Sequence, residues 1–344
     1  MGLVDAQALE LTAPRIASTL ASEPMSSFAV AHVPAARLGL APWVLVALLL
    51  TAWAPLHVAL LAPLLFGVPH VVEDLRAFVL RPVRPVAREA LWAIGLLLGA
   101  LSVARAQSLF GGPVLLRFEL GCGALALCAA RWLRPERERV WDAGLAGLCV
   151  LGALCVAWPK AAALFVAHAH NLVALGVWAA WSPRGRGRAL SILVYLLGLG
   201  LLSVGACDGL IARGLGWGGQ VGGQELSVGG LELSSLANKL APGLSPSWQA
   251  RVVAGFVYAQ ALHFAFWVLL VPAALAPRER GLGARWAAWR RDLPPLLFAC
   301  ALVGAVGVPL LGWIDGAGAR SLYLNLVLFH GWLELALIAH WGRA

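Results

Sequence analysis

The sequence predicts an all-α fold, a polytopic integral membrane helical bundle of about ten transmembrane helices with both termini in the cytoplasm. Hydrophobic residues occupy 60% of the 344 positions, and charged residues only 12%. Soluble proteins carry roughly a quarter charged residues. Long apolar runs also recur from residue 39 to the C-terminal end. Together these observations exclude an ordinary soluble globular protein.

Ten apolar segments bounded by Pro, Gly and Arg residues are expected to form the helices. They are residues 39–54, 56–79, 87–105, 112–132, 138–157, 160–182, 189–206, 249–272, 292–313 and 320–342. Only Pro55 separates the first two segments. The alternative there is one long kinked helix, followed by a half-helix that begins at Pro69.

Arginine clusters follow the second, fourth, sixth and eighth segments and predict the orientation. They are Arg76, Arg81, Arg84 and Arg88, then Arg131, Arg134, Arg137 and Arg139, then Arg184, Arg186 and Arg188, and finally Arg278, Arg280, Arg285, Arg290 and Arg291. The positive-inside rule places each of these ends in the cytoplasm, which requires an even number of spans. We expect the protein in the inner (cytoplasmic) membrane of a bacterium.

Two regions outside the apolar segments complete the predicted organisation. Residues 1–37 have no apolar stretch after a basic start, so they predict a cytoplasmic N-terminal tail that includes a solvated His32. Residues 38–344 then form a single transmembrane domain with one long outer loop, 207–248. Within this loop, the amphipathic stretch Leu231–Leu244 is either a lid on the membrane surface or a plain connection.

Charge and cysteine usage exclude two further classes. The net charge of +9 comes largely from arginines in the turns between apolar segments, where membrane topology explains it. No basic stripe with interleaved aromatic residues is present, so nucleic acid is not an expected partner. The six cysteines have no CxxC or zinc-ribbon spacing, and we expect no disulfide framework.

Ionisable residues inside the apolar segments point to a site. A charged or titratable group in hydrocarbon costs several kcal/mol at least, so it usually faces the protein interior or binds something. At about 1.5 Å rise per residue, five histidines and one glutamate from four segments fall within a slab roughly 10 Å thick. They are His70, His168, His170, His263, His330 and Glu334.

Imidazole and carboxylate groups together predict a metal site, and the lack of sulfur favours non-haem iron, mononuclear or dinuclear. All six residues are candidate ligands. Glu334 shares a helix face with His330, as Glu73 and Asp74 share one with His70, so these carboxylates are candidate catalytic groups or orient the rings. The alternative is that each histidine is a satisfied hydrogen-bonding group between helices.

The spacing of the remaining polar residues qualifies this prediction. His168 and His170 are two positions apart, about 200° around a helix, so one of them is expected to serve elsewhere. Asn171 and Gln260 share faces with His168 and His263 and could hold ring tautomers. A further set near the helix ends is expected to snorkel, cap helices or form interfacial salt links. That set is His57, His340, Arg117, Glu119 and Asp142.

The segment Gly67-Val68-Pro69-His70, followed by Asp74, resembles the Gly-x-Pro-His-x-x-x-Asp element of the Brp/Blh family of membrane-bound carotenoid-cleaving dioxygenases. The resemblance covers about eight residues. It implies that His70 is an iron ligand and that the substrate is a long conjugated or otherwise lipophilic molecule. Val71 and Val72 stand where that family usually has Gly-Ala. The family's later histidine pair is one helical turn apart, whereas His168 and His170 are two residues apart.

Three functions are consistent with these features. The first is a membrane oxygenase that uses His-ligated iron, dioxygen and a lipophilic substrate entering from the lipid. The second is a haem-binding electron carrier or quinol oxidoreductase with axial histidines. The third is a proton-coupled transporter in which His and Glu residues form a relay.

Overall fold

The computed structural model describes residues 41–82, 86–107, 112–134, 143–181, 186–217, 227–270 and 282–341. The chain divides between Arg37 and Leu38, and all described residues belong to the second unit. Part of the predicted organisation therefore lies outside the described residues. This part comprises the tail 1–37 with His32, and Arg84, Arg137, Arg139, Asp142, Arg184, Arg278 and Arg280.

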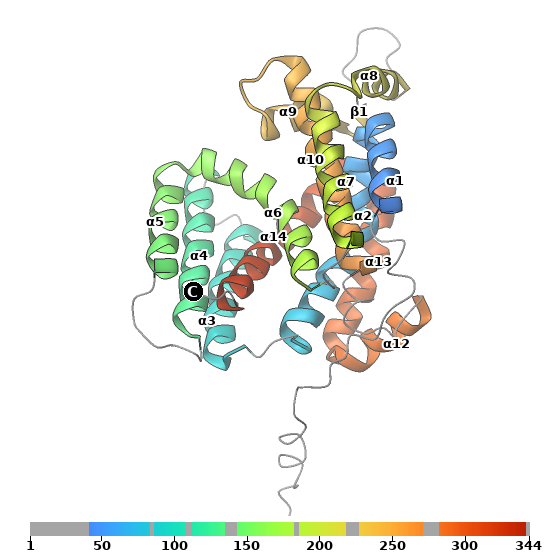
Figure 1. The fold of residues 1–344 in the computed structure, drawn as a ribbon. Coiled ribbons are helices and arrows are strands. Elements are labelled where there is room, and N and C mark those ends of the chain that lie inside the picture. The colour runs from blue at the N-terminus through green and yellow to red at the C-terminus, as the bar shows by residue number, and fades with distance from the viewer. Residues whose placement is uncertain are drawn as a thin grey trace, which may run out of the picture. The chain divides into compact units, whose positions relative to one another are not determined.

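Each of the ten apolar segments contains a helix, so the all-α fold class is confirmed (Figure 1). The helices are α1 (Ala41–Trp53), α2 (Pro55–Leu75), α3 (Arg88–Ala106), α4 (Gly112–Trp132), α5 (Ala143–Ala157), α6 (Pro159–Trp181), α7 (Arg186–Ser203), α10 (Pro246–Ala265), α13 (Pro295–Ile314) and α14 (Gly316–Trp341). Two of them continue into a π-helical turn, α2 into η3 (Arg76–Leu80) and α10 into η4 (Phe266–Leu270).

Six helical spans of the described chain are long and apolar enough to cross a membrane. They are Pro55–Leu80, Gly112–Trp132, Pro159–Ala179, Pro246–Leu269, Pro295–Ile314 and Gly316–Trp341. Three more apolar helices, α1, α5 and α7, contribute shorter stretches of 10–17 residues. These helices indicate a membrane protein, while ten crossings and the sidedness of the termini stay predictions.

The boundary between α1 and α2 falls at Ala54, whose backbone leaves the helical region with φ −140° and ψ 59°. Pro55 follows at the first position of α2, where its missing N–H leaves no intrahelical hydrogen bond unmade. Pro63 and Pro69 lie inside α2 without ending it. Two separate helices therefore form here, and α2 runs unbroken through Pro69 to His70.

Part of the predicted outer loop is regular structure. It contains α8 (Asp208–Trp217), a hairpin of β1 (Ser227–Val228) and β2 (Leu231–Glu232), and α9 (Leu233–Leu240). Gly229 and Gly230 form the hairpin turn with positive φ angles of 54° and 77°, which glycine adopts without steric cost. The apolar face of α9 belongs to one buried cluster with side chains of α2 and α10. Among the described residues, α9 therefore packs against the helical bundle.

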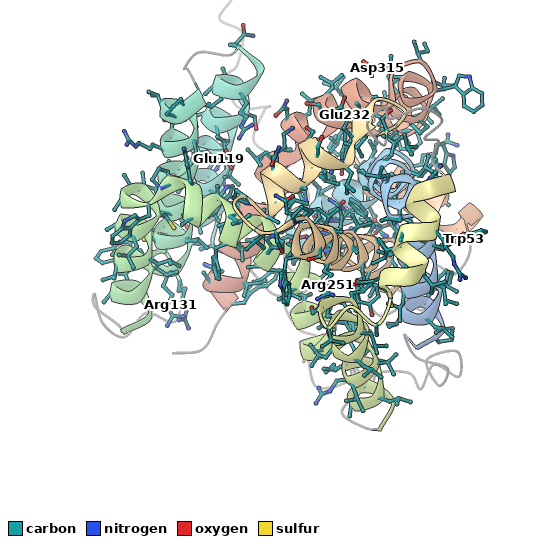
Figure 2. The ribbon with its side chains drawn as sticks, turned by 90° about the horizontal axis from the view of Figure 1, so that it is seen from above. Trp53, Glu119, Arg131, Glu232, Arg251 and Asp315 are labelled. Atoms are coloured by element: carbon teal, nitrogen blue, oxygen red, sulfur yellow. The ribbon has the colours of Figure 1, made fainter. Side chains whose placement is uncertain are left out.

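Three short helices outside the ten segments lie at the two ends of the bundle. Figure 1 shows α8 and α9 together at one end and α12 (Leu282–Asp292) at the other. Arg251 of α10 pairs with Asp208 of α8 at 2.7 Å, which fixes α8 to the bundle (Figure 2). These short helices were not predicted as helices, because they lie where the sequence indicates connections.

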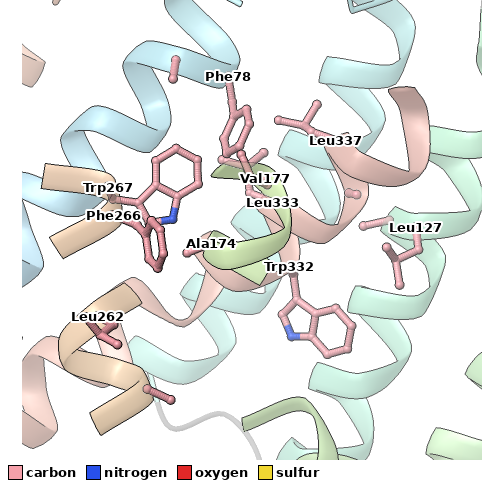
Figure 3. Packing of buried hydrophobic residues seen from close by; sticks show 14 of the residues in the cluster. Phe78, Leu127, Ala174, Val177, Leu262, Phe266, Trp267, Trp332, Leu333 and Leu337 are labelled. Carbon is pink, nitrogen blue, oxygen red and sulfur yellow. The ribbon is translucent and has the colours of Figure 1, made fainter. Parts of the chain in front are cut away.

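The main apolar core surrounds the long helix α14, which contacts α2, α3, α4 and α13. Figure 3 shows Trp267, Phe266 and Phe78 on one side of this core and Trp332 and Leu127 on another. Helix α13, by contrast, exposes large apolar side chains to the surroundings, including Trp313 at 92%. Such a continuous exposed apolar surface is typical of a helix that faces lipid.

Candidate metal centre

Four helices bring four histidines and one glutamate together inside the bundle. They are His70 of α2, His170 of α6, His263 of α10, and His330 and Glu334 of α14, which we call the His/Glu centre. Helix α10 packs beside both α2 and α6, and α14 packs beside α2. The side chains of His70 and Glu334 are completely buried, and His263 is 2% exposed.

The distances within the centre are those of groups that can share one ion. The Nε2 atoms of His70 and His263 are 3.0 Å apart, and these atoms lie 3.6 Å and 4.0 Å from Oε1 of Glu334. One ligand atom from each of His70, His263, His330 and Glu334 fits within 4.8 Å of all the others. Two nitrogens bound to one metal at about 2.1 Å are roughly 3.0–3.4 Å apart, so the spacing suits coordination.

His170 joins the centre from the side of α6. Its Nδ1 lies 3.3 Å from Oε2 of Glu334, the carboxylate oxygen that does not face His70. Its ring centroid lies 4.5 Å from that of His263 and 5.0 Å from that of His330. His170 therefore completes a ring of four imidazoles around Glu334.

The centre also contains buried polar atoms without hydrogen-bond partners, as expected of groups that bind a ligand. They are Nδ1 of His70, His170 and His263, Nε2 of His330, and both carboxylate oxygens of Glu334. Nδ1 of His330 donates to the Val327 carbonyl oxygen, which leaves its Nε2 as a free lone pair. The residues present thus fit a metal ion, and this site is where the described chain could hold one.

The two acidic residues that follow His70, Glu73 and Asp74, have different surroundings. Oδ2 of Asp74 lies 3.2 Å from Nε2 of His70, so Asp74 borders the His/Glu centre. Glu73 points away from it, and accepts hydrogen bonds from Trp289 Nε1 at 2.8 Å and from Arg76 at 3.3 Å. The structure therefore does not bring Glu73 into the centre.

His168 also lies apart from the centre. Its Nε2 is 3.1 Å from the carbonyl oxygen of Leu240, the last residue of α9, and its ring packs against Phe256. The expected separation of His168 from His170 around a regular helix explains this, since only one of them can face α14. His168 connects α6 to α9, and His170 is the member of the pair at the centre.

Two expected supporting hydrogen bonds are not formed among the described residues. Asn171 donates to the carbonyl oxygen of Ala167 in its own helix, and not to His168. The Oε1 atom of Gln260 and Nδ1 of His263 both have no partner. The ring tautomer of His263 is therefore not set by Gln260.

Of the residues expected to snorkel, cap helices or form salt links, the structure gives partners to His340 and Glu119. His57 is exposed, whereas His340 is buried, and its Nδ1 lies 2.8 Å from the Ala130 carbonyl oxygen. Nε2 of His340 accepts the N–H of Ala87, the residue that precedes α3, at 3.5 Å. Glu119 forms an ion pair with Arg105 (Figure 2).

Two aromatic residues next to the centre were missed in the sequence. Nε1 of Trp267 and the hydroxyl of Tyr323 are buried and without hydrogen-bond partners. Trp267 lies four residues after His263, and Tyr323 lies seven residues before His330, so each shares a helix face with a histidine of the centre. This periodicity is the signal that could have identified them.

Comparison with known proteins finds no family model that matches this chain, and no curated protein or solved structure with significant similarity to it. Fold and site therefore define the class of protein by themselves. The chain has the helices of a membrane protein, and within them a buried His/Glu group that could hold a metal. The resemblance of the Gly67–Asp74 segment to carotenoid dioxygenases stays a prediction.

Proposed function

We propose that the protein is an integral-membrane oxygenase of the bacterial inner membrane, with a His-ligated non-haem iron centre and a lipophilic, carotenoid-like substrate. The observation that carries the proposal is the convergence of His70, His263, His330 and Glu334 within 4.8 Å in the interior of an apolar bundle. Apolar substrates and dioxygen both partition into such surroundings, and water is excluded from them.

The donor set supports iron. Imidazole nitrogens and carboxylate oxygens without sulfur are the ligands of non-haem iron in proteins, and iron of this kind supplies binding and activation of dioxygen. Two buried carboxylates, those of Glu334 and Asp74, would balance the charge of one divalent cation in a medium of low dielectric constant. The group of four suits one ion, and His170 with Asp74 would offer donors to a second.

The protein's own residues would hold and protect this centre. The hydrogen bond from Nδ1 of His330 to the Val327 carbonyl oxygen fixes the tautomer that points Nε2 inward. Phe264 packs on the rings of His70 and His263, and Trp267 lies 6.2 Å from the ring of His70. These rings would exclude water from the side of α10, so that a metal held there would supply its chemistry in apolar surroundings.

The geometry disfavours the haem alternative. The 3.0 Å between Nε2 of His70 and Nε2 of His263 is too short for these two histidines to be the axial ligands of one haem. Asp74 and Glu334 would also have no role as ligands in an axial-histidine site. The transporter hypothesis requires the same buried His and Glu residues but no metal. Metal content therefore distinguishes the oxygenase from the transporter.

The test is metal analysis and a visible spectrum of the same detergent-purified sample, followed by addition of a carotenoid in air and without oxygen. We expect stoichiometric iron, no Soret band, and bleaching of the carotenoid absorption that requires oxygen. A Soret band would support the electron carrier. Absence of bound metal would support the transporter and overturn the proposal.

A further inference from the structure

The hydroxyl group of Tyr323 is a buried hydrogen-bonding group that the proposed metal ligands leave unused. Tyr323 lies on α14 and is 2% exposed, and its Oη atom has no hydrogen-bond partner. An unpaired buried hydroxyl is unfavourable, so such a group commonly meets water or a ligand. Because Tyr323 lies seven residues before His330, its side chain leaves α14 on the face that carries the centre.

The position of the Tyr323 ring is set by a glycine of α2. A Cβ atom added at Gly67 would overlap with the Cζ, Oη and Cε2 atoms of Tyr323, so only glycine admits the phenol at this place. Gly67 lies one helical turn before His70. The hydroxyl therefore lies about one turn from His70, beside the His/Glu centre.

The acidic groups around this hydroxyl distinguish it from other buried tyrosines. It lies close enough to Asp74 and Glu334 for their carboxyl groups to act on it electrostatically. All four oxygens of these carboxyls also have no hydrogen-bond partner. Tyr195 of α7 has an equally buried, unpaired hydroxyl, but its ring neighbour is Tyr258. An unpaired hydroxyl alone is no site, and the surroundings of Tyr323 are what make it one.

We propose that the Tyr323 hydroxyl donates a hydrogen bond to the small exogenous ligand of the metal centre, dioxygen or a small anion in its place. Tyr323 is then a ligand-binding residue, and Gly67 is the residue that gives it room. This inference rests on the proposed function, because it requires a metal at the His/Glu centre. It adds to that function a specific donor from the side of α14 and α2.

The experiment uses the full-length protein in detergent, loaded with Co²⁺ and titrated with azide, while the visible bands of cobalt report binding. Tyr323→Phe removes the donor and keeps the ring. We expect it to bind cobalt as the wild type does, and to bind azide about tenfold more weakly or worse, because a hydrogen bond to an anion is lost. Tyr195→Phe is the matched control and should leave azide affinity unchanged.

A second variant tests the same idea through the glycine. Gly67→Ala should displace the phenol ring, and so weaken azide binding while cobalt is retained. Equal azide affinity of wild type and Tyr323→Phe, both with cobalt bound, would overturn the inference and leave the proposed function intact. An equal loss in Tyr195→Phe would also overturn it. Wild-type protein that binds no cobalt would overturn the proposed function itself.

Discussion

Glu73 and Asp74 are neighbours in α2 but belong to two different polar regions. Glu73 is part of the α12 network, which consists of Glu73, Arg76, Arg81, Trp289, Arg291 and Asp292. Arg76 joins both carboxyls of this network, since it lies 3.3 Å from Glu73 and 2.8 Å from Asp292. Asp74 borders the His/Glu centre instead.

The two regions differ in how their carboxylate oxygens are satisfied. In the α12 network, Trp289 and Arg76 donate to the two oxygens of Glu73, and Arg291 and Arg76 serve those of Asp292. At the His/Glu centre, the four oxygens of Asp74 and Glu334 have no hydrogen-bond partner. The α12 network supplies its own cations, whereas Glu334 of the centre and the bordering Asp74 are two acids without a lysine or arginine partner among the described residues. A metal ion would complete the second region and not the first.

The largest effect is expected from a ligand substitution at the centre. His330→Ala removes the Nε2 lone pair that faces the other ligands, so metal content should fall at least about tenfold, because a ligand and not a supporting group is lost. Metal analysis of the purified variant measures this directly. His57→Ala, at an exposed position that was not predicted to belong to the site, is the control and should retain its metal. Equal metal content in the two variants would contradict the assignment of the centre.

A crossed pair of substitutions sharpens the comparison between the two regions. Asp74→Asn should weaken metal binding about 10- to 100-fold, without lowering the stability of the metal-free protein, because Asp74 is buried beside a second acid, Glu334, and its charge has no lysine or arginine partner among the described residues. Glu73→Gln should leave metal binding unchanged. It should lower the free energy of unfolding by about 1–2 kcal/mol, because the charge that pairs with Arg76 is lost.

Metal titration measures the metal affinity of both variants. Thermal unfolding of each variant, with and without metal, measures its stability. If Glu73→Gln also lost metal, the two regions would be one functional unit. If Asp74→Asn destabilised the metal-free protein as strongly as Glu73→Gln, then Asp74 would be structural.

The apolar helices could be predicted because their signal is local. Apolar runs predicted all ten of these helices, and α4 has the predicted bounds, Gly112–Trp132. The short helices α8, α9 and α12 could not be predicted in this way, since they have 8–11 residues and lie within polar or glycine-rich connections. Their positions depend on packing against helices far away in the sequence.

The site was predictable as a set of residue types but not as a set of contacts. The depth of the histidines follows from residue spacing, and it identified His70, His170, His263 and His330 together with His168. Which of His168 and His170 faces α14 depends on how α6 is rotated against α10, a property of tertiary packing. The separation of Glu73 from Asp74 likewise depends on Trp289, which lies 216 residues further along the chain.

The smallest expected effect concerns Asp292 of the α12 network and depends on pH. The guanidinium groups of Arg291 and Arg76 hold the pKa of Asp292 well below its usual range. Because the pKa is lower in the folded than in the unfolded protein, the stabilisation is complete above the unfolded value, about pH 4, and is lost as the pH falls through the folded value. Asp292→Asn should therefore cost about 1 kcal/mol at neutral pH, since two of its partners are exposed.

Thermal unfolding of wild type and Asp292→Asn between pH 7 and pH 3 measures this difference. We expect a constant gap in melting temperature down to about pH 4, which then narrows as the wild-type carboxyl becomes protonated. Metal content should be unchanged throughout the neutral range. Glu232→Gln, at an exposed carboxyl (Figure 2), is the control and should show no gap at any pH. A gap that instead widened in acid would mean that Asp292 is not stabilised in its charged form, and that the α12 network does not satisfy its own carboxylates.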